Sequence, residues 1–356
     1  MRDAGLSALL VTNRANLRYL TGLDASAGTL LIGIETAVLI VDFRYATAGR
    51  EVVARTRGLE LQVATGLADS AIAETVRAHG GLRVGIEAEH LTVSRFNHLS
   101  ASIASAGLPM EARTAPALVP VEGTVERLRA VKDEGEIATL REAGRRLSQV
   151  ARTARDWLVP GRSEREVAAG IDSRLRDAGF ERTAFETIVA SGPNGALPHG
   201  RPTTRRLAVG DGVVLDFGGV YDGYCVDLTR TLHIGPMPPQ FRRLFEAVRE
   251  AQAAAIAAVK PGVSAADIDR EARQVLEQRG LGEAFGHGTG HGLGLEVHEA
   301  PRISSAASHE ERVVPGMVFT IEPGAYVPGI GGVRIEDDIL VTGDGCELLT
   351  DVPIDF

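Results

Sequence analysis

The hydrophobic pattern of residues 1–118 alternates between short apolar runs and helical periodicity. Apolar runs of about five residues are typical of buried strands, whereas apolar positions spaced three and four apart predict helices. This alternation predicts an α/β domain. The predicted strands are residues 6–12, 29–34, 37–42 and 82–86, with Glu35-Thr36 turning between the second and third, and the predicted helices are residues 70–79 and 94–106.

Pro116, Pro120 and Gly123 interrupt the pattern and indicate a connection between domains, which we place at residues 119–133. A second domain is expected at residues 134–356. It begins with an amphipathic helix, because apolar residues recur from Ile137 to Leu158 at three- and four-residue steps.

The second domain passes twice through one plan of elements. In each half a long helix stops at Pro-Gly, a serine then caps a second helix, and a histidine segment precedes a strand and a hairpin. Two such α+β halves facing each other would bring both hairpins to one cleft. The paired features are Pro160-Gly161 and Pro261-Gly262, Ser163 and Ser264, and His199 and His298.

Each hairpin carries two carboxylates on strand-like residues. A turn at Tyr221-Asp222 would put Asp216 directly opposite Asp227, and a turn centred on Gly329 would put Glu322 opposite Glu336. Directly opposed residues share a face of the sheet, with Cβ atoms about 4.5–5.5 Å apart. Burying four such carboxylates without a cation would be costly, so the pattern predicts a metal site.

The segment from Gly286 to Glu299 holds three histidines and five glycines. Glycine permits close backbone approach where a Cβ would clash, so the segment is suited to a binding site. An imidazole added to four carboxylates forms an oxygen-rich ligand set, which favours Mn²⁺, with Co²⁺ or Zn²⁺ as alternatives. Two ions about 3.5–4 Å apart would share a water, lower its pKa and promote attack on a carbonyl.

Charge and cysteine content exclude other classes of function. The 38 Lys+Arg and 47 Asp+Glu give a net charge of -9, which disfavours nucleic-acid binding. Two cysteines cannot form a disulfide framework, the first residues lack the apolar core of a signal peptide, and no apolar run would span a membrane. We therefore expect a cytoplasmic protein without a membrane partner.

Four motifs together resemble the pita-bread metallopeptidases, specifically Xaa-Pro aminopeptidases and prolidases. The most specific runs from His287-Gly288-Thr289-Gly290-His291 to Val297-His298-Glu299. The others are Ser191-Gly192-Pro193-Asn194 before Pro198-His199, Asp227-Leu228-Thr229-Arg230-Thr231, and Val333-Arg334-Ile335-Glu336-Asp337. Residues 1–118 are similar to the N-terminal domain shared by aminopeptidase P, prolidase and creatinase.

The resemblance implies an α/β N-terminal domain and an α+β pita-bread catalytic domain with an internal pseudo-twofold repeat. It also implies a dinuclear enzyme that cleaves before proline, in dipeptides or longer peptides, and that is commonly a homodimer. The implied roles cover nine residues. Asp227 and Glu336 would bridge the ions, Asp216 would complete one site and His291 with Glu322 the other, His199 and His298 would contact the substrate, and His287 and Arg334 would line the pocket.

Three other functions fit parts of the pattern. A creatinase-like amidino hydrolase shares both domains, but it works without these metals, whereas this chain keeps all five ligands. A noncatalytic binding module would share the architecture, but such relatives typically lose ligands. A methionine aminopeptidase is disfavoured by the additional N-terminal domain.

Overall fold

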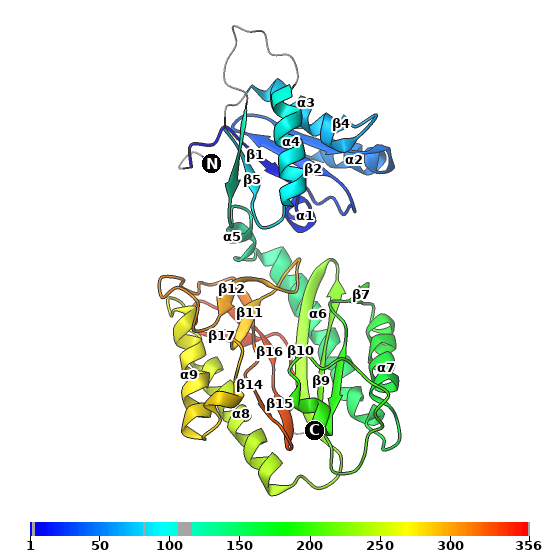
Figure 1. The fold of residues 1–356 in the computed structure, drawn as a ribbon, viewed down its shortest axis with the longest axis vertical. Helices are drawn as coiled ribbons and strands as arrows, with labels where there is room; N and C mark the ends of the chain where they lie inside the picture. Colours follow the sequence, from blue (N-terminus) through cyan, green and yellow to red (C-terminus); the bar gives the residue numbers. More distant parts are fainter. Residues whose placement is uncertain (2–3, 81–82, 106–115, 355–356) are drawn as a thin grey trace. The chain divides into compact units, whose positions relative to one another are not determined.

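The computed structural model describes residues 1, 4–80, 83–105 and 116–354. The chain forms two compact units, residues 1–127 and 128–356, which we describe separately (Figure 1). Predicted strand position 82 and predicted helix position 106 lie outside the described residues.

The first unit is a six-stranded mixed sheet in the order β4-β3-β2-β1-β5-β6. The predicted hairpin forms, with β2 and β3 paired antiparallel, and the predicted α/β alternation is present. Its elements are β1 (Ala8–Val11), α1 (Arg14–Thr21), β2 (Thr29–Gly33), β3 (Ala37–Val41), α2 (Ala46–Arg55), β4 (Leu59–Val63), α3 (Ala68–His79), β5 (Arg83–Glu87), α4 (Val93–Ser105) and β6 (Ala117–Val121).

Two apolar clusters cover the two faces of this sheet. Ile72 of α3 and Leu99 of α4 pack on one face, while Leu17 of α1 and Val52 of α2 pack on the other. The start of the expected connection belongs to this unit, because β6 pairs in parallel with β5. A short helix, α5 (Glu126–Arg129), follows β6.

The second unit contains four helices and the remaining sheets. In Figure 1, α6 and α7 flank β9 and β10, whereas α8 and α9 flank the strands of the C-terminal half. Its elements are α6 (Glu134–Ala154), α7 (Glu164–Asp177), β7 (Arg182–Thr183), β8 (Ile188–Ser191), β9 (Gly212–Tyr221), β10 (Tyr224–His233), α8 (Pro239–Ala258), α9 (Ala265–Gln278), β11 (Gly290–Gly292), β12 (Glu299–Ile303), β13 (Val318–Ile321), β14 (Gly324–Val327), β15 (Gly331–Arg334), β16 (Asp337–Val341) and β17 (Cys346–Leu348).

The predicted internal repeat is present in the second unit. Ser163 caps α7 in a capping box with Glu166, and Ser264 caps α9 by accepting from the backbone of Asp267. Each serine also forms an isolated antiparallel bridge, one to Arg206 and the other to Arg312. The two halves therefore repeat their loop contacts as well as their order of elements.

The register of the β9–β10 hairpin differs from the prediction by one turn position. Asp222 and Gly223 form the two-residue loop, with φ of 46° and 78°, because Asp-Gly suits a turn that needs positive φ at both positions. Asp216 therefore pairs with Thr229 rather than with Asp227. The two carboxylates are diagonal neighbours, and they still share one face of the sheet because the shift preserves strand parity.

The second carboxylate pair has the predicted register. Ile321 pairs with Asp337 on one side of the pair, and Gly324 pairs with Arg334 on the other. Glu322 and Glu336 lie between these ladders at opposed positions. No helix among the described residues combines the length and apolar character needed to cross a membrane.

Candidate metal centre

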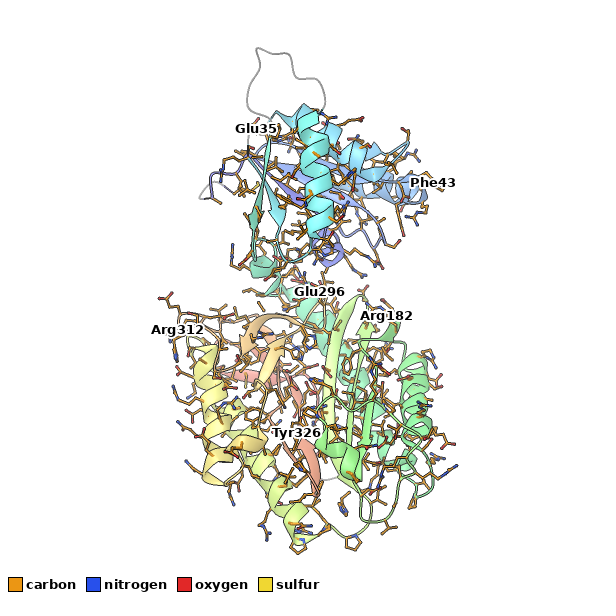
Figure 2. The ribbon with its side chains drawn as sticks, viewed as in Figure 1. Glu35, Phe43, Arg182, Glu296, Arg312 and Tyr326 are labelled. Atoms are coloured by element: carbon orange, nitrogen blue, oxygen red, sulfur yellow. The ribbon has the colours of Figure 1, made fainter. Side chains whose placement is uncertain are left out.

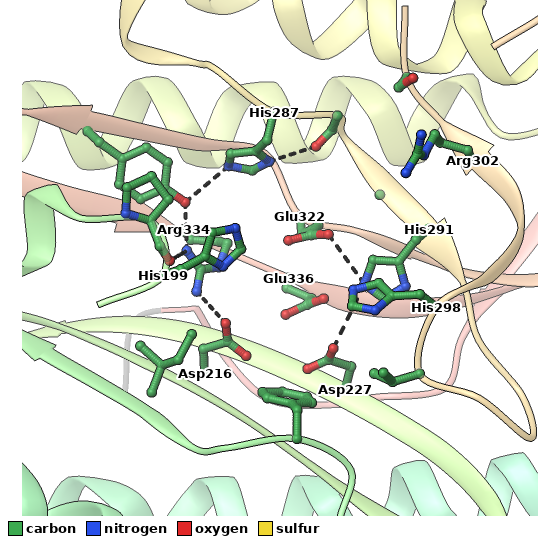
Figure 3. Close-up of a pocket in the computed structure, with 18 residues that line it drawn as sticks. His199, Asp216, Asp227, His287, His291, His298, Arg302, Glu322, Arg334 and Glu336 are labelled. Carbon is green, nitrogen blue, oxygen red and sulfur yellow. Dashed lines mark hydrogen bonds and ion pairs between the residues drawn. The ribbon is translucent and has the colours of Figure 1, made fainter. Parts of the chain in front are cut away.

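All nine predicted site residues line one pocket of about 520 Å³ in the second unit (Figure 3). Its floor comes from the two hairpins, and its wall comes from the glycine-rich segment around β11. Sequence positions more than one hundred residues apart therefore meet in one cleft, as the internal repeat predicts.

Three side chains form the tightest group of metal-ligating atoms. Asp227, His291 and Glu336 each offer a ligand atom, and these atoms all lie within 4.8 Å of one another. Two hydrogen bonds join the segments of Asp227 and Glu336: the Glu336 N–H donates to Thr229 O at 3.1 Å, and the Asp227 N–H donates to the Asp338 side chain at Oδ2, 3.0 Å away. The two halves of the unit are thus hydrogen-bonded together beside the group.

Glu322 and Asp216 flank the group from opposite directions. Glu322 Oε1 lies 3.5 Å from His291 Nε2, so these two side chains are already adjacent. Asp216 instead accepts a hydrogen bond from Arg334 Nη2. The structure therefore brings together four of the predicted ligands and places the fifth beside them, in an ion pair with a guanidinium.

Burial dominates the electrostatics of the carboxyl cluster. Desolvation, with added repulsion from Asp216, raises the pKa of Asp227 well above its usual range and raises the pKa of Glu322 to about 8. The pKa of Glu336 is also well above its usual range, through burial and then the charges of Asp227 and Glu322. A set of acids that resist ionisation together is a set that a cation would stabilise.

The histidines are held in their neutral forms. Burial lowers the pKa of His291 to about 4, with His298 adding repulsion, and burial lowers the pKa of His287 to about 4. Neutral imidazole is the form that binds a metal. The His291 and His298 rings lie 4.3 Å apart between centroids, whereas His199 approaches from the first half of the unit.

A hydrogen-bonded chain connects Arg334 to the cluster. Its guanidinium donates to Asp216, to the hydroxyl of Tyr326 at 2.6 Å and to Thr229 Oγ1 at 3.2 Å. Thr229 in turn donates to Glu336 Oε2 at 2.6 Å, and Tyr326 lies 3.1 Å from His287 Nε2. Arg334 therefore contacts one candidate ligand directly and another through a threonine.

The loop that carries His199 is held by a buried carboxylate. Glu164, at the start of α7, accepts from Ser191 N at 2.8 Å on one side of the loop and from Thr203 N at 2.9 Å on the other. Asn194 adds two bonds at 3.1 Å. These donors lower the pKa of Glu164 although burial opposes the shift.

Tyr326 and Arg302 are among the pocket residues that the sequence reasoning missed. Tyr326 bonds both Arg334 and His287, and Arg302 of β12 lines the cleft near His298. Tyr326 lies four residues after Glu322 on a strand leaving the site, which is the signal that could have identified it. Two other tyrosines of this unit do not line the pocket, because Tyr224 donates to Glu136 and Tyr221 packs against Phe180.

The residues present fit divalent cations. Asp227 Oδ1 is buried without a hydrogen-bond partner among the described residues, and it belongs to the group with converging ligand atoms. Several buried carboxyls beside a neutral imidazole are a ligand set for hard or borderline ions. Asp227, His291, Glu322 and Glu336 would hold such ions, together with Asp216.

Comparison with known families agrees with this geometry. Residues 138–343 match Metallopeptidase family M24, and residues 1–131 match the Creatinase/Prolidase N-terminal domain. The chain belongs to metallopeptidase family M24. Its predicted fold class is confirmed, since this M24 chain joins a creatinase-type N-terminal domain to a pita-bread catalytic domain. A divalent metal and a peptide substrate follow from membership of the family.

Relatives resemble this M24 chain along nearly its whole length. The uncharacterized peptidase YqhT of Bacillus subtilis is 38% identical, covering 98% of this chain and 95% of the relative. The structure of an Xaa-Pro dipeptidase from Bacillus anthracis is 36% identical with a TM-score of 0.91, covering 99% and 95% of the two chains. An X-Pro aminopeptidase from Thermotoga maritima is 34% identical with a TM-score of 0.85, covering 98% and 96%.

Proposed function

We propose that this protein hydrolyses the peptide bond between a first residue and a following proline, using two divalent ions. The observation that carries the dinuclear part is the convergence of Asp227, His291 and Glu336 within 4.8 Å, flanked by Glu322 and Asp216. The preference for proline is supported by similarity to an Xaa-Pro dipeptidase and an X-Pro aminopeptidase.

The ligand roles are proposed from the family resemblance, and the positions in the cluster are compatible with them. Asp227 and Glu336 lie centrally and are proposed to bridge both ions, with Asp216 completing one site and His291 with Glu322 the other. When bound, such ions supply an activated water at neutral pH and positive charge for the developing oxyanion. Mn²⁺ is the proposed metal, with Co²⁺ or Zn²⁺ as alternatives.

The side chains facing the cluster are proposed to handle the substrate. His199 and His298 are exposed in the cleft, one from each half, so they can contact a peptide between them. A neutral imidazole can donate a hydrogen bond to the carbonyl oxygen, and an imidazole that takes up the proton released by the attacking water can pass it to the leaving proline nitrogen. His287 and Arg334 are proposed to support this wall of the pocket.

We further propose that the protein is a homodimer and is located in the cytoplasm.

A substrate and metal matrix tests the proposal. Protein stripped with a chelator would be reloaded with Mn²⁺, Co²⁺ or Zn²⁺, with metal content measured at each step. Each form would be assayed on an Xaa-Pro dipeptide, an Xaa-Pro-Xaa tripeptide and the matched alanine peptides. We expect proline-dependent cleavage that requires metal, and the ratio of dipeptide to tripeptide rates separates dipeptidase from aminopeptidase. Full activity in demonstrably metal-free protein would overturn the proposal, as would equal cleavage of the alanine peptides.

A further inference from the structure

Three buried charged side chains lie beside the loop that carries His298. The side chains of Arg129, Lys132 and Glu299 are only 3%, 1% and 5% exposed. Arg129 ends α5 and Lys132 precedes α6, whereas Glu299 begins β12 directly after His298. Two cations from one segment thus converge on a carboxylate next to a proposed substrate-contacting residue.

The contacts fix both ends of the segment 296–299. Arg129 Nη2 pairs with Glu299 Oε1 and lies 2.9 Å from Glu296 Oε2, while Lys132 Nζ lies 3.5 Å from Glu299 Oε2. Glu296 also donates its N–H to Glu299 Oε1 at 2.9 Å. Figure 2 labels Glu296, the outer end of this arrangement. His298 lies between two anchored residues.

The cations are themselves tied to the frame of the metal centre. Lys132 donates its N–H to Gly316 O at 2.9 Å, and Val131 forms a β-bridge with Met317. Met317 leads directly into β13, which ends next to Glu322. The segment that fixes Glu299 is therefore attached to the same strand that delivers a candidate ligand.

Simple stabilisation is a poor explanation for this cluster. The Lys132 ammonium makes no hydrogen bond of good geometry among the described residues, so its burial is compensated by the charges of Glu299 and, more weakly, Glu136. Buried ion pairs often contribute little net stability compared with apolar packing, and registry is their best-attested use. Gly294 supports a registry role, because a Cβ there would lie 2.8 Å from Glu299 Oε2.

We propose that Arg129 and Lys132 are positioning residues for His298, acting through Glu299 to hold its imidazole over the metal centre. The observation behind this is that the His298 ring lies 4.3 Å from the His291 ring, although His298 is exposed on a loop between two short strands. Without the anchor, the loop would sample other positions while the ligand cluster stayed intact. This inference rests on the proposed function in one respect, namely that His298 contacts the substrate.

A double-mutant cycle tests this role. Arg129→Met should lower kcat by about 10- to 100-fold, the usual loss when a group that orients a functional side chain is removed, with metal content unchanged and KM changed less than kcat. In a His298→Ala background the same substitution should cause little further loss, because the residue it positions is gone. Arg129→Lys and Glu299→Gln provide milder changes if the methionine variant does not fold. Arg141→Met, which breaks an exposed ion pair with Glu347, is the matched control and should leave kcat unchanged.

A measurement independent of turnover follows the imidazole itself. In metal-free protein with ¹³C-labelled histidine, the His298 signal is assigned by its loss in His298→Ala. Arg129→Lys should shift or broaden that signal while leaving the His199 signal in place. The inference would be overturned if Arg129→Met lowered kcat by the same factor with and without His298. It would also be overturned if the His298 signal kept its position and width in Arg129→Lys. If the wild type cleaves no Xaa-Pro peptide, the proposed function fails, and the spectrum still decides whether the anchor positions His298.

Discussion

The two halves of the catalytic unit build the same cleft by different means. The first half supplies Asp216 and Asp227 from one uninterrupted hairpin of two ten-residue strands, β9 and β10. The second half supplies its ligands at breaks, since Glu322 and Glu336 lie between short strands and His291 lies at a bulge. Continuous pairing sets the carboxylate spacing in the first half, whereas close-packed glycines position His291 in the second.

Glycine requirements mark the irregular half. A Cβ at Gly290 would lie 1.9 Å from Thr320 O, and one at Gly292 would lie 2.1 Å from Ala300 O. These two glycines flank His291, so the backbone on both sides packs too closely for any side chain. A metal ligand can thus be positioned by strand register alone, as in the first half, or by close backbone contacts that only glycine allows, as in the second.

The largest expected effect comes from the central ligand of the regular half. Asp227→Asn removes a charge that both ions are proposed to share, so activity should fall by more than about 10⁴-fold and should not return with more Mn²⁺. Asp216→Asn should empty mainly one site and should respond to added metal. Metal stoichiometry and peptidase rate measured on both variants check this. Two tightly bound ions and near-normal turnover in Asp227→Asn would refute the bridging role.

The two histidines allow the halves to be compared directly. His199→Ala and His298→Ala should each lower kcat by roughly 10²–10⁴-fold, the range for a proton-transfer or oxyanion group. Metal content should stay at the wild-type value in both, because neither side chain belongs to the converging ligand group. Loss of an ion from either variant would show that a ligand had been mistaken for a substrate contact.

Replacing Glu164, which anchors the His199 loop in the first half, is expected to lower kcat by a smaller factor. Glu164→Gln weakens the bonds that hold both sides of the His199 loop, so kcat should fall about 10-fold, and by much less in a His199→Ala background. Glu166→Gln is the matched control, since that carboxylate only caps α7. The pKa of Glu164 is lowered in the fold from its usual value of 4.5, so its stabilisation is present above pH 4.5 and is lost as pH falls below it. A Glu164→Gln melting temperature that declines in acid as steeply as the wild type would contradict this.

Much of the architecture could be predicted because the relevant patterns are local. Apolar runs, Pro-Gly stops and serine caps each depend on a few neighbouring residues, so the elements and the repeat followed from the sequence. The hairpin register failed for an equally local reason, since the preference of Asp222-Gly223 for positive φ decides the turn. Parity preserved the shared face of Asp216 and Asp227 despite that error.

Contacts between distant segments could not be predicted in the same way. The pairing of Asp216 with Arg334 joins two halves of the chain, and the Arg129 to Glu299 contact crosses 170 positions. Composition gives no sign of which arginine meets which carboxylate. Only the folded arrangement shows that Thr229 and Tyr326 connect groups that the motifs had already identified.

The smallest expected effect is on the pH dependence of stability in metal-free protein. It arises from protonation of Glu322 in the second half. The pKa of Glu322 is raised to about 8 in the fold from its usual value of 4.5, so between these values the folded state holds a proton that the unfolded chain releases. Its contribution to stability must then fall as pH rises toward 8. The pKa values of His291 and His287 are lowered to about 4 from 6.5, so near pH 6.5 the unfolded chain binds protons on these rings that the fold does not. This opposing effect fades as pH rises through about 7 to 7.5, where the rings are neutral in both states.

Melting temperatures between pH 7 and 8 test this sign. Metal-free protein should lose a few degrees across the window, since one proton per pH unit corresponds to about 1.4 kcal/mol and such a change shifts a domain of this size by about 2–4 °C. Mn²⁺-loaded protein should not lose these degrees, because bound cations keep the carboxylates ionised and stabilise the fold by mass action. Glu322→Gln should flatten the metal-free slope. A metal-free melting temperature that rises with pH would mean that the buried acids ionise as easily in the fold as in the unfolded chain, and the electrostatic argument for a cation site would lose its support.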